Sequence, residues 1–231
     1  MMGYIGKFPT PQPLTATDIP DLSASKITSG TLADARFPST LPAVSGANLT
    51  GIASDFVKIT TTNITSSTSS VDYTNSVIST TYKTFKVLLS NAKLSDDNAN
   101  LKLRISTDNG SSFLSSSIYA RNIWATSDDS GNDSFSGRAS TTTGMDMGHI
   151  ASGGNASGES QNAELTFLNP HSTANQKYVT VVGGFLDHNG NGRSLFGTFR
   201  INTTSAISGL QVLPGSGTIS TLNISIYGIK A

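Results

Sequence analysis

The chain has 231 residues, 15 basic and 15 acidic side chains, and no cysteine. Balanced charge excludes the basic surface expected of a nucleic-acid-binding protein, and the lack of cysteine excludes disulfides, iron–sulfur clusters and thiol catalysis. Ser, Thr, Gly and Asn dominate the composition, whereas charged residues make up only 13%. This composition predicts an all-β protein with many turns, of a length that fits one large domain with an appendage.

Apolar runs are short throughout the chain. None approaches the roughly 20 residues that cross a bilayer, so the sequence predicts no membrane insertion. The first residues, Met1 to Lys7, lack the apolar stretch of a signal peptide, so we do not expect export by that route.

Residues 1–21 are rich in proline. Pro9, Pro11 and Pro13 hold the backbone extended and remove the donors that a β-ladder needs. A segment with so few apolar side chains cannot form a core, and we expect it to become ordered along a partner. Apolar side chains in partner pockets carry most binding energy. The expected anchors are Tyr4, Ile5 and Phe8.

Residues 22–56 carry apolar side chains at a spacing that fits neither a helix nor a strand. The first four of them recur every five residues. Because no single face of this segment could bury them, we expect them to pack against copies of the same segment around a shared axis. The side chains expected at this shared axis are Leu22, Ile27, Leu32, Phe37, Leu49 and Ile52.

From about residue 57, apolar and polar residues alternate, which predicts a β domain over residues 57–231. The expected strands are 84–89, 101–106, 117–124, 163–168, 177–186, 195–202, 206–213 and 222–227. About eight to ten short strands predict a jelly-roll-like β-sandwich. Residues 126–161 interrupt the pattern with small polar residues, so this stretch is either a functional surface or hides a short strand near 137–150.

Two phrases in residues 22–56 resemble the shaft sequences of tailed-bacteriophage fibre proteins. They are residues 22–38 (LSASKITSGTLADARFP) and residues 44–52 (VSGANLTGI). Residues 3–6 (GYIG) resemble the virion-attachment peptides of some of these proteins, and residues 224–229 (ISIYGI) resemble the last strand of their β-rich tip domains. These motifs cover about a quarter of the chain.

The resemblance implies an elongated homotrimer on the virion, assembled in the host cytoplasm. Its N-terminus would bind other tail or capsid proteins, and its C-terminal domain would lie outermost and adhere to a bacterial surface glycan. The chain is shorter than long receptor-seeking fibres, which leaves open a capsid-attached fibre or decoration protein without a dedicated receptor. From different classes of protein, a tail-associated polysaccharide hydrolase and a bacterial cell-surface adhesin stay open as well.

Residues that could carry catalysis are scattered. Glu159 and Glu164 are five residues apart, which puts them on opposite faces of a strand rather than in a glycosidase pair. The aspartate pairs at 96–97 and 128–129 lie in turn-like sequences. The histidines lack the spacing of metal ligands. We therefore predict a non-enzymatic protein with no cofactor and no catalytic metal.

Residues 187–192 (DHNGNG) match the first half of an EF-hand calcium loop, with oxygen ligands at Asp187, Asn189 and Asn191. Thr198 stands where the loop requires a bidentate Glu. A β-hairpin explains the same residues through backbone geometry, because Asn and Gly accept positive φ. We expect the hairpin, with calcium as the alternative.

Trp124 lies where a predicted strand meets the polar stretch. An aromatic ring stacks on a sugar while nearby polar groups bond its hydroxyls, although a lone tryptophan also suits a core. We expect the glycan surface to combine residues 126–161 with the loop 187–194. The expected glycan-binding residues are Tyr119, Trp124, Asp187, His188 and Asn189.

Overall fold

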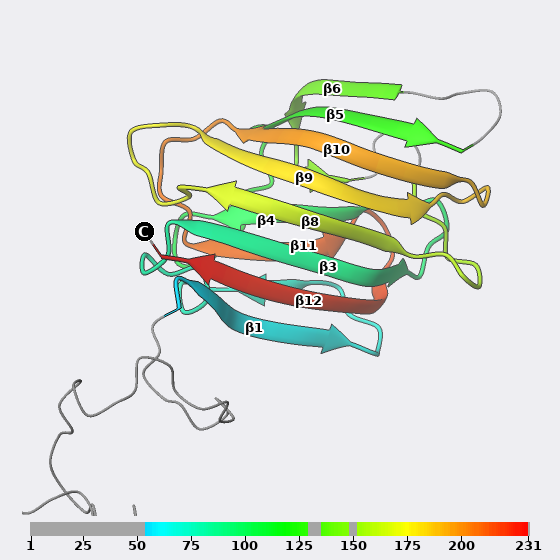
Figure 1. Cartoon of the computed structure of the whole chain (residues 1–231), viewed down its shortest axis with the longest axis horizontal. Coiled ribbons are helices and arrows are strands. Elements are labelled where there is room, and N and C mark those ends of the chain that lie inside the picture. Colours follow the sequence, from blue (N-terminus) through cyan, green and yellow to red (C-terminus); the bar gives the residue numbers. More distant parts are fainter. Residues whose placement is uncertain (1–53, 129–134, 148–151, 231) are drawn as a thin grey trace, which may run out of the picture. The chain divides into compact units, whose positions relative to one another are not determined.

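The computed structural model in Figure 1 describes residues 54–128, 135–147 and 152–230, with the backbone alone for 135–141. These residues belong to a compact unit, Ala53–Ala231, which is separate from Met1–Ile52. The expected anchors Tyr4, Ile5 and Phe8 lie outside the described residues. So do the residues expected at the trimer axis: Leu22, Ile27, Leu32, Phe37, Leu49 and Ile52.

The described chain is all-β and contains no helix. Its strands are β1 (Phe56–Ile64), β2 (Val71–Tyr73), β3 (Thr84–Leu94), β4 (Leu101–Ser106), β5 (Tyr119–Ser127), β6 (Phe135–Thr142), β7 (Met145–Asp146), β8 (Gln161–Leu168), β9 (Lys177–Leu186), β10 (Gly192–Ile201), β11 (Gly209–Pro214) and β12 (Ile219–Ile229). The short strand considered near 137–150 is present as β6 and β7.

The strands form two antiparallel sheets that pack face to face (Figure 1). The larger sheet has eight strands in the order β1-β12-β3-β8-β9-β10-β5-β6, and the smaller has four in the order β2-β11-β4-β7. Among the described strands, β5–β6, β8–β9 and β9–β10 are joined within one sheet, and the remaining connections cross between sheets. The predicted β-sandwich is therefore confirmed.

The strand order is that of a jelly roll with two insertions. The quartets β1-β12-β3-β8 and β2-β11-β4-β7 make the two four-stranded sheets of a double Greek key. The hairpin β5–β6 is inserted between β4 and β7, and β10 is inserted between β8 and β11 together with β9. These four strands extend one sheet beyond the jelly roll, and we call them the added half-sheet.

Alternation along the strands builds the core between the sheets. On β3, Phe85, Val87 and Leu89 point inward and are buried, and β12 buries Ile224 and Ile226 in the same way. The added half-sheet also contributes to the core: over part of each of the strands β5, β9 and β10, every second residue is buried. Truncation of one such side chain to Ala costs about 2–5 kcal/mol, so the core fixes which face of each strand is outside.

The two ends of the sandwich are formed by different segments of the chain. Phe56 pairs with Ile229, and the Lys230 amide donates to the Asp55 carbonyl at 2.9 Å, so the chain enters the domain beside the end of β12. We call this the Ser54 end. The β9–β10 turn and the last residues of β5 lie at the opposite end, which we call the hairpin end (Figure 1).

Candidate functional site

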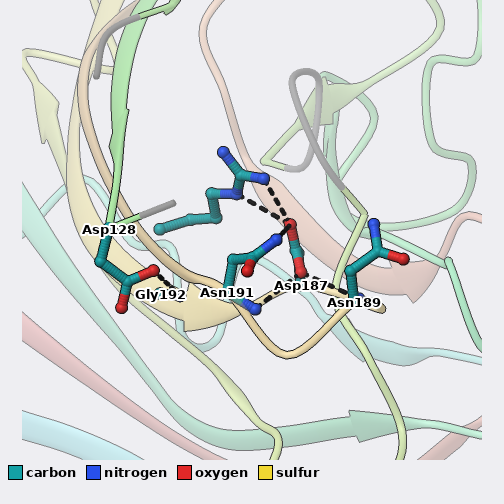
Figure 2. Close-up of polar contacts among 6 residues, drawn as sticks. Asp128, Asp187, Asn189, Asn191 and Gly192 are labelled. Carbon is teal, nitrogen blue, oxygen red and sulfur yellow. Dashed lines mark hydrogen bonds and ion pairs between the residues drawn. The ribbon is translucent and has the colours of Figure 1, made fainter. Parts of the chain in front are cut away.

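The β9–β10 turn at the hairpin end is organised by the carboxylate of Asp187, which is fully buried. Its Oδ1 accepts hydrogen bonds from the amides of Asn189 and Asn191, both at 2.9 Å. Its Oδ2 accepts from Arg193 Nε at 2.8 Å and from the second guanidinium nitrogen at 2.6 Å (Figure 2). Gly190 adopts a φ of 82°, as a tight turn requires. The hairpin interpretation of residues 187–192 is confirmed.

The electrostatics of this turn argue against the calcium alternative. Burial alone would raise the pKa of Asp187, but hydrogen bonds from Asn191, Arg193 and Asn189 outweigh it and lower that pKa. Arg193 supplies the positive charge that a cation would bring. Among the described residues, no group of three His, Asp or Glu side chains could hold a metal ion. Asp187 therefore shapes the loop and cannot contact a glycan, which corrects its assignment as a binding residue.

The predicted meeting of residues 126–161 with the 187–194 loop is confirmed for the described parts. The Gly192 amide donates to Asp128 Oδ1 at 2.6 Å, and the Asp128 amide donates to the Gly192 carbonyl at 3.1 Å. The His188 amide donates to the Ser152 carbonyl at 3.2 Å. Beside this contact lies a hollow of about 320 Å³, lined by Thr126, Asp128, Phe185, Arg193 and Ser194 among others.

His188 and Asn189 differ in accessibility. Asn189 is exposed at the tip of the turn, where its side-chain amide is open to a ligand. His188 is half-buried, and its buried Nδ1 has no hydrogen-bond partner in the described part of the chain. Of these two predicted residues, Asn189 therefore lies on the surface.

Tyr119 is wrongly assigned to the surface. Its side chain is fully buried between the sheets. Its hydroxyl accepts from the Ile105 amide at 3.0 Å and donates to the Leu114 carbonyl at 2.9 Å. Burial raises its pKa to about 12. A ring held in this way ties β5 to β4 and cannot stack on a sugar.

Trp124, in contrast, lies on the outer face of the added half-sheet and is 48% exposed. Its strand partner on β10 is Phe196, whose own partner on β9 is Val182. Phe196 and Val182 are 51% and 62% exposed. Directly opposed residues on neighbouring strands have Cβ atoms about 4.5–5.5 Å apart, so these three side chains form one continuous apolar row.

Polar residues flank the apolar row on both sides. On one side, Asn122 of β5, Thr198 of β10 and Thr180 of β9 lie opposite one another in register. On the other side, the corresponding residues are Thr126, Ser194 and Gly184. The side-chain hydroxyls and amide of these flanks make no hydrogen bond within the described residues. Gly184 has no side chain to cover this face, and a Cβ added there would lie 3.2 Å from the Arg193 carbonyl oxygen. The row is therefore an accessible apolar strip bordered by unused donors and acceptors.

Charged groups lie at the margins of this face. Glu164 of β8 lies opposite Val182 of β9 and forms an ion pair with Lys86 of β3. Arg200 is exposed opposite Tyr178, itself 52% exposed, nearer the Ser54 end. The second glutamate, Glu159, is buried, and its Oε2 accepts from the Ala156 amide at 2.5 Å. Both glutamates thus have structural partners of their own.

Phe196, Val182 and Tyr178 were missed by reasoning from sequence, although a signal was present. Leu195, Phe199 and Ile201 share one parity on β10 and form its buried face. Phe196 has the opposite parity, so it must point outward. Three neighbouring strands with large apolar residues of outward parity would have indicated the row.

No protein-family model matches the chain, and neither a curated protein nor a solved structure matches it. Among the residues that the structure describes, no helix is long and apolar enough to cross a membrane. The features of the chain that bear on function are therefore the geometry of the outer face and the motifs of the sequence.

Proposed function

We propose that the chain is a non-enzymatic fibre protein of a tailed-bacteriophage virion. It is a homotrimer, anchored to tail or capsid proteins through residues 1–21 and assembled along residues 22–56. Its β-sandwich domain adheres to a neutral glycan on the bacterial surface. The shaft-like phrases of residues 22–38 and 44–52 support the fibre, and the outer face of the added half-sheet supports the adhesion.

The apolar row is the observation that carries the glycan assignment. An indole or phenyl ring covers the C–H face of a sugar, and neighbouring amides and hydroxyls bond its hydroxyl groups. Trp124 and Phe196 provide the rings, and Asn122 and Thr198 provide unused polar groups one register row away. The charge of Glu164 is offset by Lys86, and the exposed Arg200 lies nearer the Ser54 end, away from Trp124 and Phe196.

The position of the row on the added half-sheet strengthens this assignment. A jelly roll closes without β5, β6, β9 and β10, so these strands are not required by its topology. Exposed apolar patches on a soluble domain mark binding surfaces more often than chance. We expect each row to bind weakly, because water competes for every sugar hydroxyl, and a trimer to raise avidity by roughly 10²–10⁴.

The experiment is biosensor binding of the full-length protein to immobilised bacterial O-antigen and capsular polysaccharides. We expect saturable binding to at least one of them, faster to dissociate when the density of immobilised glycan is low. Absence of binding to every polysaccharide would contradict the adhesion and favour a capsid-attached decoration protein. Immunogold electron microscopy of particles then places the protein on the tail or on the capsid.

A further inference from the structure

A second hollow lies at the Ser54 end, away from the hairpin end. Its cavity volume is about 460 Å³, within the roughly 300–1,000 Å³ of small-ligand pockets. Its lining comes from the connections β2–β3, β4–β5, β8–β9 and β10–β11. We infer that this hollow is a separate binding site, which takes a neutral sugar residue, free or at the end of a glycan.

The rim of the hollow is closed by hydrogen bonds between different connections. They are His171 Nε2 to the Ser79 carbonyl (2.9 Å), the Ile207 amide to the Pro170 carbonyl (3.0 Å) and the Asn109 amide to Ser208 Oγ (2.8 Å). Each of them joins two segments that are far apart in the sequence. The walls are therefore held in place without a ligand, which lowers the ordering cost of binding.

The wall formed by residues 107–109 has its own support. Asp108 accepts hydrogen bonds from Ser106 Oγ at 2.6 Å and from the amide and hydroxyl of Ser112 at 2.9 and 2.5 Å. These bonds lower the pKa of Asp108 to about 2. The carboxylate is thus committed to its own turn, while Thr107 and Asn109 on either side line the hollow.

The lining offers polar groups that have no partner. Four of the lining side chains make no hydrogen bond within the described residues: Asn75, Thr80, Thr107 and Asn109. His171 Nε2 donates to a carbonyl, so Nδ1 of the neutral ring is an acceptor. The apolar floor is Ile78 and Ile207, which are 4% and 1% exposed.

This combination selects the class of ligand. Among the described residues that line it there is no lysine, arginine, aspartate or glutamate, so the hollow offers no permanently charged side chain to pair with a phosphate, an acidic sugar or a metal cation. The floor exposes too little apolar surface to hold a lipid or an apolar side chain of a peptide. Amides and hydroxyls around a small apolar floor match a ligand with several hydroxyl groups and a C–H face, which is a neutral sugar.

The test is saturation-transfer NMR of the full-length protein with D-glucose, D-galactose, D-mannose and N-acetyl-D-glucosamine. The double variant Asn75→Ala/Asn109→Gly removes two amides, and glycine accepts the φ of 64° found at Asn109. Thr107→Val removes a hydroxyl at nearly constant shape. The matched control is Asn98→Gly, which removes an exposed amide at a φ of 60° outside the hollow.

We expect saturable millimolar binding of at least one sugar to the wild type. The double variant should weaken it by about tenfold, which corresponds to about 1.4 kcal/mol, with a smaller loss for Thr107→Val. Asn98→Gly and Trp124→Ala should bind as the wild type does. The inference is overturned if none of the four sugars binds, or if either of these last two variants weakens binding as much as the double variant. Loss in Trp124→Ala alone would assign the sugar to the apolar row and leave the proposed function intact.

Discussion

Replacement of Asp187 by Asn tests how the hairpin end is held together. The amide oxygen of Asn can still accept from Asn189 and Asn191, whereas the negative charge beside Arg193 is lost. The Arg193 side chain is 8% exposed, so little water can compensate its charge. Removal of one partner of a buried ion pair costs about 3–5 kcal/mol. Because a hairpin end can open locally, we expect the lower value, about 3 kcal/mol.

The assay is urea unfolding of the full-length protein at pH 7 and at acid pH. The lowered pKa of Asp187 means that its contribution is present above the ordinary value of 3.8 and is lost as pH falls through the folded-state value. The Asn variant should therefore lose less stability on acidification than the wild type. Asp128→Asn is the control, since that exposed carboxylate accepts one bond from Gly192 and should cost no more than about 1 kcal/mol. An Asp187→Asn protein as stable as the Asp128→Asn protein would refute the reasoning.

Two further predictions concern the core and the shaft. Tyr119→Phe leaves the buried Ile105 amide without its acceptor and should cost about 1–3 kcal/mol in urea unfolding. Burial raises the pKa of Tyr119 to about 12, so its contribution to the free energy of unfolding is complete below pH 10 and is lost as pH rises toward 12. The stability difference between wild type and variant should therefore shrink between pH 10 and pH 12. A difference that stays constant would contradict this role of the Tyr119 hydroxyl. Ile27→Asp should convert a full-length trimer to monomer in light scattering, since three charges would meet at the axis. Ser25→Asp is the control and should stay trimeric. A monomeric wild type would refute the shaft assignment.

The alternation of apolar residues predicted much of the fold. Phe85, Val87 and Leu89, and likewise Leu222 to Ile226, occupy the buried face that their period of two requires. Strand β1 is rich in threonine and contains a register shift between Lys58 and Thr60, so its pattern is weak. Strand β2 has three residues and exists through pairing with β11. Such strands depend on partners distant in sequence, which a local pattern does not contain.

The candidate site was predicted in part. Turn residues indicated the hairpin, whereas its contact with the polar stretch was expected without a pattern that required it. Neither signal reveals that Arg193 pairs with the Asp187 carboxylate or that the Tyr119 hydroxyl accepts from the Ile105 amide of another strand. Lys177 is a similar case, because it is buried at the start of β9 and bonds the carbonyls of Asn175 and Thr203. In each case the role of the side chain is decided by a group from another strand or loop.

The most direct test compares Trp124→Ala and Phe196→Ala with Phe56→Ala in binding to the polysaccharide that the wild type recognises. Phe56 is a matched control, because it is 49% exposed on the outer face of the same sheet but on β1, outside the added half-sheet. Truncation of a surface side chain should leave stability nearly unchanged in all three variants. We predict that each of the first two lowers affinity at least about tenfold and that Phe56→Ala does not. Equal affinity in all three variants would contradict the assignment of the glycan to the apolar row.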